Sequence, residues 1–72
     1  MSVHLLIQFL IKNNQRIGFE FKYGDAPKLT NAMRSAFEIL ELNKLMVIYP
    51  GKRAYSLAKG IEVMGLSEFI SG

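Results

Sequence analysis

The feature that most constrains the fold is an alternating stretch from Arg16 to Tyr23. Its side chains are of two kinds, apolar at Ile17, Phe19, Phe21 and Tyr23 and small or charged at Gly18, Glu20 and Lys22. A period of two is that of a β-strand, whose successive side chains point to opposite faces of a sheet. The pattern therefore predicts a strand over 16–23, with Glu20 and Lys22 about 7 Å apart on one face.

The segment before this strand, residues 3–12, is apolar at nearly every position. A strand that is apolar on both faces usually lies inside a sheet or is covered on both sides. Asn13 and Asn14 follow it, and asparagine tolerates the left-handed backbone of a tight hairpin turn. The sequence thus predicts a hairpin of two strands, over about 3–12 and 16–23.

An amphipathic helix is predicted over about residues 30–42. Apolar side chains recur there every three or four positions, at Leu29, Met33, Phe37 and Leu40. That spacing is typical of a helix with one buried face. Thr30 is a suitable N-cap, and Asn43 is expected to end the helix.

A short apolar strand is predicted over 45–49, directly after the helix. A strand–helix–strand crossover makes the two strands parallel, so this strand should run parallel to the one over 16–23. We expect residues 54–60 to be irregular, with Tyr55 and Leu57 pointing inward. A last strand is expected over 61–63, and a further helical turn over 66–70.

These elements predict the α+β class: a small mixed sheet in β-β-α-β-β order with one helix on one face. With 72 residues the chain has room for one domain, 1–72, and 50% of its residues are hydrophobic. One helix covers one face of a sheet, and the first strand is apolar on both. We therefore expect the uncovered apolar face to bind a second copy of the chain, as in a homodimer, or a partner chain.

Charge and residue usage exclude several classes of protein. The chain has no cysteine, which excludes disulfides and thiolate metal sites, and its formal net charge is only +3. No stretch resembles a signal peptide, and the apolar run near the start is too short to span a bilayer. We expect a cytoplasmic protein with no membrane contact.

Several strings in the sequence resemble a known family. FEFKY-x-DAPKLT at 19–30 and VIYPG at 47–51 are similar to the C-terminal domain of a prokaryotic family of AAA-type P-loop ATPases. That tail domain has a restriction-endonuclease-like core, and the resemblance covers about residues 5–66. Because the chain has no G-x-x-x-x-G-K-[ST] loop, we expect no ATP binding by that mechanism. We expect a truncated stand-alone domain, without the ATPase part and the first strand and helix of the nuclease-like core.

The resemblance implies the E-x-K half of a nuclease site at Glu20 and Lys22. Such a site needs an aspartate on the preceding strand, and that position falls near His4, whose imidazole suits softer metals than Mg²⁺. Asp25 follows the strand in a turn. We therefore predict a non-catalytic domain without metal or cofactor, in which Glu20 and Lys22 form a solvent-side ion pair. The alternative is a Mg²⁺-dependent nuclease that uses both residues.

A basic edge is the last candidate site. Ligands tend to bind beyond the carboxyl ends of parallel strands, and that edge gathers Lys22, Lys28, Lys52 and Arg53 near a helix N-terminus. Such a geometry favours phosphate, and Tyr23, Tyr49 and Tyr55 would offer stacking surface. We predict an accessory binding module that touches nucleic acid through this edge. Two alternatives are that these cations only keep the protein soluble and that the chain is purely a protein–protein interaction or dimerisation module.

Overall fold

The structure is a computed structural model that describes residues 8–71. Its elements are β1 (Gln8–Lys12), β2 (Gln15–Phe21), α1 (Asn31–Ile39), β3 (Lys44–Tyr49), β4 (Ala54–Ala58), β5 (Ile61–Gly65) and α2 (Leu66–Ser71). The described strands form one sheet in the order β1-β2-β3-β5-β4. The inner pairs are parallel and the outer pairs antiparallel. The predicted α+β class and mixed sheet are confirmed, as is the parallel pairing of β2 with β3.

The first hairpin turns at Asn13 and Asn14, as predicted. Their φ angles are 54° and 63°, and a two-residue hairpin turn of this type needs positive φ at both positions. β1 lies at one edge of the sheet, because β3 occupies the other side of β2. Of the two expected placements, an interior position is therefore excluded for Gln8–Lys12, and coverage on both sides stays a prediction. Residues 3–7 of that predicted strand, with His4, lie outside the described residues.

Helix α1 begins where the sequence predicted and ends earlier. The backbone N–H of Met33 donates to Thr30 Oγ1 at 3.1 Å, which confirms the N-cap. The helix stops at Ile39 because Glu41 adopts a φ of 53°. The Leu42 N–H then donates to the Phe37 carbonyl at 2.9 Å, the 6→1 bond of a Schellman motif.

Asn43, which was expected to end the helix, instead joins the starts of β2 and β3. Its side-chain Oδ1 accepts from the backbone N–H of Arg16 at 2.8 Å, and its own N–H donates to the Arg16 carbonyl at 2.8 Å. The crossover from β2 through α1 to β3 is thereby closed by two hydrogen bonds.

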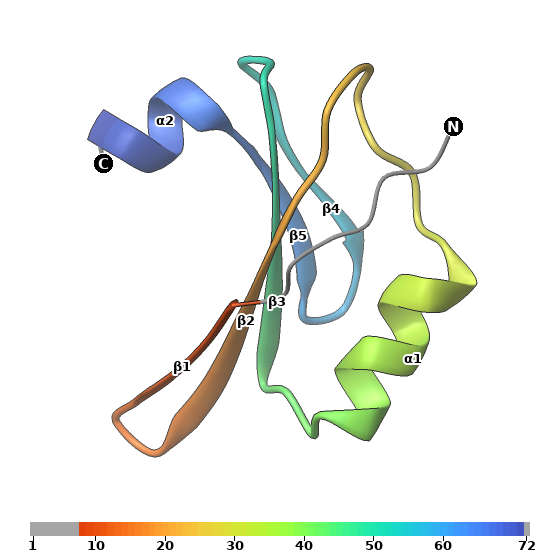
Figure 1. The fold of residues 1–72 in the computed structure, drawn as a ribbon, viewed down its shortest axis with the longest axis vertical. Helices are drawn as coiled ribbons and strands as arrows, with labels where there is room; N and C mark the ends of the chain where they lie inside the picture. The colour runs from red at the N-terminus through yellow and green to blue at the C-terminus, as the bar shows by residue number, and fades with distance from the viewer. Residues whose placement is uncertain (1–7, 72) are drawn as a thin grey trace.

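Helix α1 and helix α2 lie on opposite faces of the sheet (Figure 1). The main core lies under α1, where the alternate residues of β3 and β5 are buried together with side chains from the helix and its end. Its buried members are Met33, Leu42, Leu45, Val47, Tyr49, Ile61 and Val63. Two helices instead of one correct the predicted architecture. Within residues 8–71 neither helix has the length and apolar character needed to cross a membrane.

The C-terminal third is more regular than predicted. Residues 54–58 form the edge strand β4, not an irregular segment, and β5 extends from Ile61 to Gly65. The two strands are joined at a turn where Gly60 has a φ of 84°. β4 has a bulge between Ser56 and Ala58, where the Ser56 hydroxyl donates to the Ala58 carbonyl at 3.1 Å. The helical turn predicted over 66–70 is confirmed as α2.

Candidate functional site

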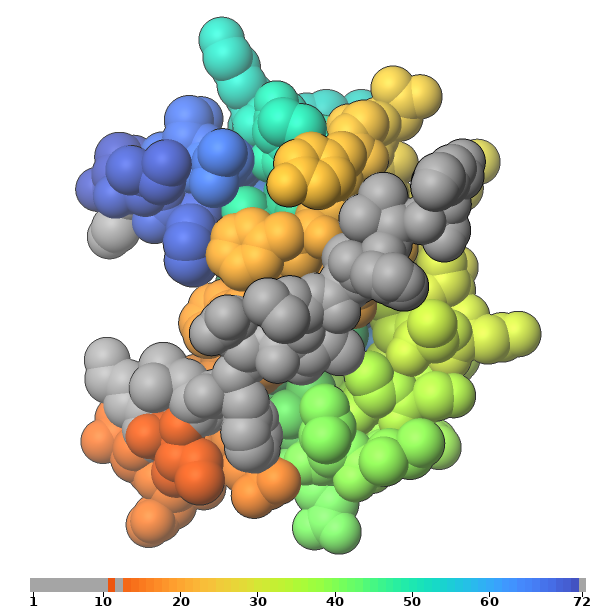
Figure 2. All heavy atoms as spheres, viewed as in Figure 1, coloured from red at the N-terminus to blue at the C-terminus, as the bar shows by residue number. Residues whose placement is uncertain are grey.

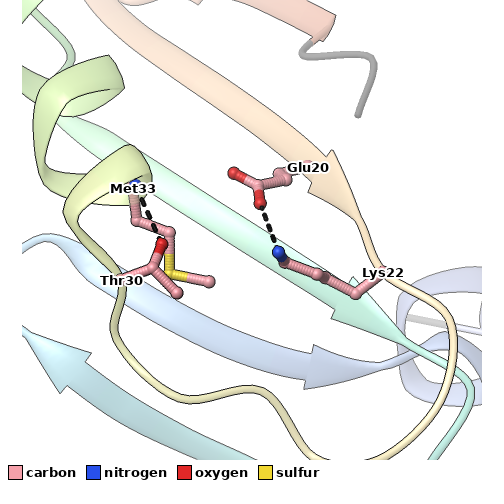
Figure 3. A network of polar contacts seen from close by, with 4 residues as sticks. All are labelled: Glu20, Lys22, Thr30 and Met33. Carbon is pink, nitrogen blue, oxygen red and sulfur yellow. Dashed lines mark hydrogen bonds and ion pairs between the residues drawn. The ribbon is translucent and has the colours of Figure 1, made fainter. Parts of the chain in front are cut away.

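The two candidate catalytic residues, Glu20 and Lys22, lie on the face of the sheet that α1 covers. Glu20 pairs in register with Val47 of the core, and its exposed fraction is 3%. Lys22 Nζ lies 3.4 Å from Glu20 Oε2, with 29% of the lysine side chain exposed (Figure 3). The expectation of a solvent-side ion pair is therefore wrong, because the carboxylate of Glu20 is buried.

The alternation of β2 showed that Glu20 and Lys22 share a face, but not which face the helix covers. Gly18 precedes them on that face, and a Cβ there would lie 2.8 Å from Leu42 Cδ1. The missing side chain lets the end of α1 approach β2 closely. The helix is thereby seated on the face of β2 that carries glycine and the ion pair.

A divalent-metal site is not assembled from the described residues. Within 8–71, no three histidine, cysteine, aspartate or glutamate side chains are grouped closely enough to hold a metal ion. Asp25 is exposed in the loop that follows β2. Within residues 8–71, the charged side chain that lies beside the Glu20 carboxylate is that of Lys22.

The predicted basic edge retains three of its four cations as exposed side chains. Lys28, Lys52 and Arg53 are exposed on the loops beyond the carboxyl ends of the parallel strands, whereas Lys22 is turned toward Glu20. Of the four predicted residues, Lys28, Lys52 and Arg53 are therefore accessible to an anionic ligand.

Tyr55 holds the two basic loops together. Its hydroxyl donates to the carbonyl of Pro27 at 2.7 Å, one residue before Lys28. The guanidinium carbon of Arg53 lies 5.6 Å from the centroid of the same ring, within the range of a cation–π contact. One side chain thus fixes the loop before α1 against the loop before β4.

Two of the three tyrosines of the predicted stacking surface, Tyr49 and Tyr55, make contacts within the domain instead. Tyr49 is buried, and its hydroxyl accepts from the backbone N–H of Arg53 at 3.0 Å, so its face is closed to a nucleic-acid base. Burial raises the pKa of Tyr55, Tyr49 raises it further, and Arg53 lowers it. Tyr23, with 78% of its surface exposed, keeps an open ring.

The opposite face of the sheet carries apolar side chains and is crossed by α2. The Phe69 ring of α2 lies 5.8 Å from that of Phe19 and 5.9 Å from that of Phe21, measured between centroids. Met46 and Ile48 of β3 are the register partners of these two residues. This contact was not predictable from hydrophobic periodicity, because a six-residue helix is too short to show a period.

Helix α2 leaves apolar hollows beside it. One, with a volume of about 420 Å³, is lined by Phe19, Met46, Met64, Glu68 and Phe69. Another, of about 210 Å³, lies at the ends of β2 and β3 and includes Phe21 and Leu66. In the space-filling view α2, in blue, stands over a notch in the outline (Figure 2). We call this surface the α2 face and define it by Phe19, Phe21, Met46, Met64, Leu66 and Phe69, together with Ile70 from an adjoining hollow that Leu66 also lines.

Comparison with known proteins gives two similar sequences. They are Uncharacterized protein Mb2031c of Mycobacterium bovis and Uncharacterized protein Rv2008c of Mycobacterium tuberculosis, each 30% identical over 54 residues. The match covers 75% of this chain and 12% of each relative, so the chain corresponds to a small part of those proteins. No family model and no solved structure matches the chain.

Proposed function

We propose that the chain is a non-catalytic binding module that recognises another polypeptide through the α2 face. The observation that carries this proposal is the exposure of large apolar side chains on both sides of α2. The exposed fraction is 37% for Phe21, 38% for Leu66 and Phe69, and 72% for Ile70. A contiguous apolar surface of this kind marks an interaction site more often than open protein surface. Aromatic and methionine side chains are also enriched at the centres of interfaces.

We propose that the chain derives from the restriction-endonuclease-like C-terminal domain of AAA-type ATPases. The FEFKY-x-DAPKLT and VIYPG strings support it, as does the placement of Glu20 and Lys22 at the end of a strand that enters a parallel crossover. The burial of Glu20 supports a stabilising role in place of metal binding. Plasmid nicking that needs Mg²⁺ or Mn²⁺ and is lost in Glu20→Ala would restore the nuclease alternative.

Polypeptide binding at the α2 face is tested by selecting displayed random peptides on the immobilised full chain. Ile70→Glu places a charge on the α2 face, while Ile39→Glu makes the same change on α1, where Ile39 is 76% exposed. Because both positions are exposed, each substitution should alter the free energy of unfolding by less than about 0.5 kcal/mol. We expect selected peptides to bind wild type and Ile39→Glu alike and to lose at least about tenfold in affinity for Ile70→Glu.

Sedimentation velocity of the chain alone, from micromolar concentration upward, is the companion measurement. An assembly that Ile70→Glu dissociates and Ile39→Glu preserves would identify a second copy of the chain as the polypeptide on the α2 face. A chain that remains monomeric and selects no peptide would refute the proposed function.

A second candidate function is nucleic-acid binding at the basic edge. Its supporting observation is that Tyr55 pins the loops of Lys28 and Arg53 together, with Lys52 exposed beside Arg53. Three phosphate contacts give a slope of about −3 in a plot of log affinity against log salt for duplex DNA. The combined variant Lys52→Glu with Arg53→Glu should abolish most of that binding without unfolding the domain. Affinity that is unchanged by salt or by this variant would exclude the basic edge.

A further inference from the structure

The larger hollow beside α2 has one charged lining residue, the acidic Glu68, in a chain whose net charge is positive. Glu68 is exposed and lines the hollow, whose remaining lining residues are apolar. Glu62 of β5 is the register partner of Met46, which places both on the face that α2 crosses. The formal net charge of the chain is +3, whereas the charged residue that lines this hollow is acidic.

The floor of this hollow is suited to an adaptable apolar contact. The hollow is lined by two methionines, Met46 and Met64, and by the rings of Phe19 and Phe69. Methionine side chains are flexible and polarisable, and they recur at surfaces that bind peptides of varied sequence. The volume of about 420 Å³ falls in the range of ligand-binding clefts, about 300–1,000 Å³.

Building on the proposed function, we infer that the α2 face binds an amphipathic segment of a partner protein with a lysine or arginine next to its apolar anchor. The anchor enters the hollow against Met46, Met64 and the Phe69 ring, and the cation pairs with Glu68. On a helical segment, residues three or four apart lie on the same side, so one turn presents both groups. A charge at the rim of an interface acts mainly on selectivity and on the association rate.

The same charges argue against a second copy of the chain on this face. A two-fold symmetric contact brings a surface against itself. Wherever Glu68 lies near the two-fold axis it would face its own copy, and like charges in opposition are unfavourable. A segment with a lysine or arginine avoids this repulsion, so we favour a basic partner segment over a second copy of the chain.

The charge preference is tested with the random peptides selected on the full chain. Glu68→Lys reverses the charge at the hollow, and Glu38→Lys makes the same change on the exposed side of α1. We expect enrichment of lysine or arginine within about four positions of an aromatic or aliphatic anchor. Affinity of these peptides should fall by about tenfold for Glu68→Lys and by less than about twofold for Glu38→Lys. Selection on Glu68→Lys itself should enrich aspartate or glutamate instead.

Two results would overturn the inference and leave the proposed function in place. One is a set of peptides that lose affinity in Ile70→Glu but carry no basic residue and do not respond to Glu68→Lys. The other is a homodimer through the α2 face that excludes every peptide. Failure to select any peptide, with a monomeric chain, would overturn the inference and the proposed function together.

Discussion

Removing the charge of Lys22 is the most direct test of the buried ion pair. Lys22→Met keeps the length of the side chain and leaves the carboxylate of Glu20 enclosed without its partner. Breaking a fully buried pair in this way costs about 3–5 kcal/mol. Because 29% of the Lys22 side chain is exposed, water reaches the pair from one side, and we expect about 2–3 kcal/mol. A domain of this length is stable by about 4–11 kcal/mol, so the loss is a large share of the total.

The variant Glu20→Leu should behave differently, although it removes the more buried partner. It leaves Lys22, whose ammonium group can turn to solvent, so the cost should be below about 1 kcal/mol. The combination of Glu20→Leu with Lys22→Met replaces the pair by apolar groups and should lie within about 1 kcal/mol of wild type. The asymmetry between the two single variants is the diagnostic result.

Urea unfolding followed by circular dichroism measures all four proteins of this cycle. Thermal unfolding should show a drop of about 10–20 °C for Lys22→Met, at about 4–8 °C per kcal/mol. Lys28→Met, at an exposed lysine, is the control and should change stability by less than about 0.5 kcal/mol. A Lys22→Met variant as stable as this control would show that the pair contributes nothing and that Glu20 is hydrated.

Three further predictions concern the backbone and Tyr55. Glu41→Gly should raise the free energy of unfolding by about 0.5–1 kcal/mol, since Glu41 has a φ of 53° that glycine adopts without a Cβ penalty; a loss of stability in urea would contradict the Schellman end. Gly65→Ala should cost more than about 2 kcal/mol or prevent folding, because a Cβ would overlap the carbonyl oxygen of Gly51; near-wild-type melting would disprove the close approach. Tyr55→Phe should cost about 1 kcal/mol at neutral pH through the lost hydrogen bond to Pro27. Because folding raises the pKa of Tyr55 above 10.0, its protonated form stabilises the fold fully below pH 10 and less as pH rises through the folded pKa; a phenylalanine variant with the same alkaline decline would refute this.

The sequence predicts local structure correctly where a single residue type determines the backbone conformation. Asn13 and Asn14 tolerate positive φ, and the hydroxyl of Thr30 satisfies the first turn of α1, so both predictions are confirmed. The end of the helix was not readable in this way, since Asn43 is the better left-handed residue, yet Glu41 takes that conformation. The position of Leu42 in the core decides where the helix must stop, and this is a tertiary constraint.

The candidate site was predicted less well, because it depends on which face of β2 the helix covers. Period two places Glu20 and Lys22 together whichever face is chosen, and the apolar side chains opposite them suggested a core there. Close packing over Gly18 and the addition of α2 on the other face reversed that expectation. Strand β4 was missed although Tyr55 and Leu57 alternate with smaller residues, because five residues between two turns are a weak signal.

The bulge in β4 has a consequence for a protein that leaves apolar side chains uncovered. An edge strand offers its outer backbone groups to any extended chain, and regular edges invite stacking into fibrils. At Ser56 the spacing of those groups is irregular, and the serine hydroxyl occupies the Ala58 carbonyl. A neighbouring sheet would have to reproduce the same irregularity to continue the ladder. The irregular backbone of β4 therefore opposes edge-to-edge polymerisation of the domain at this strand.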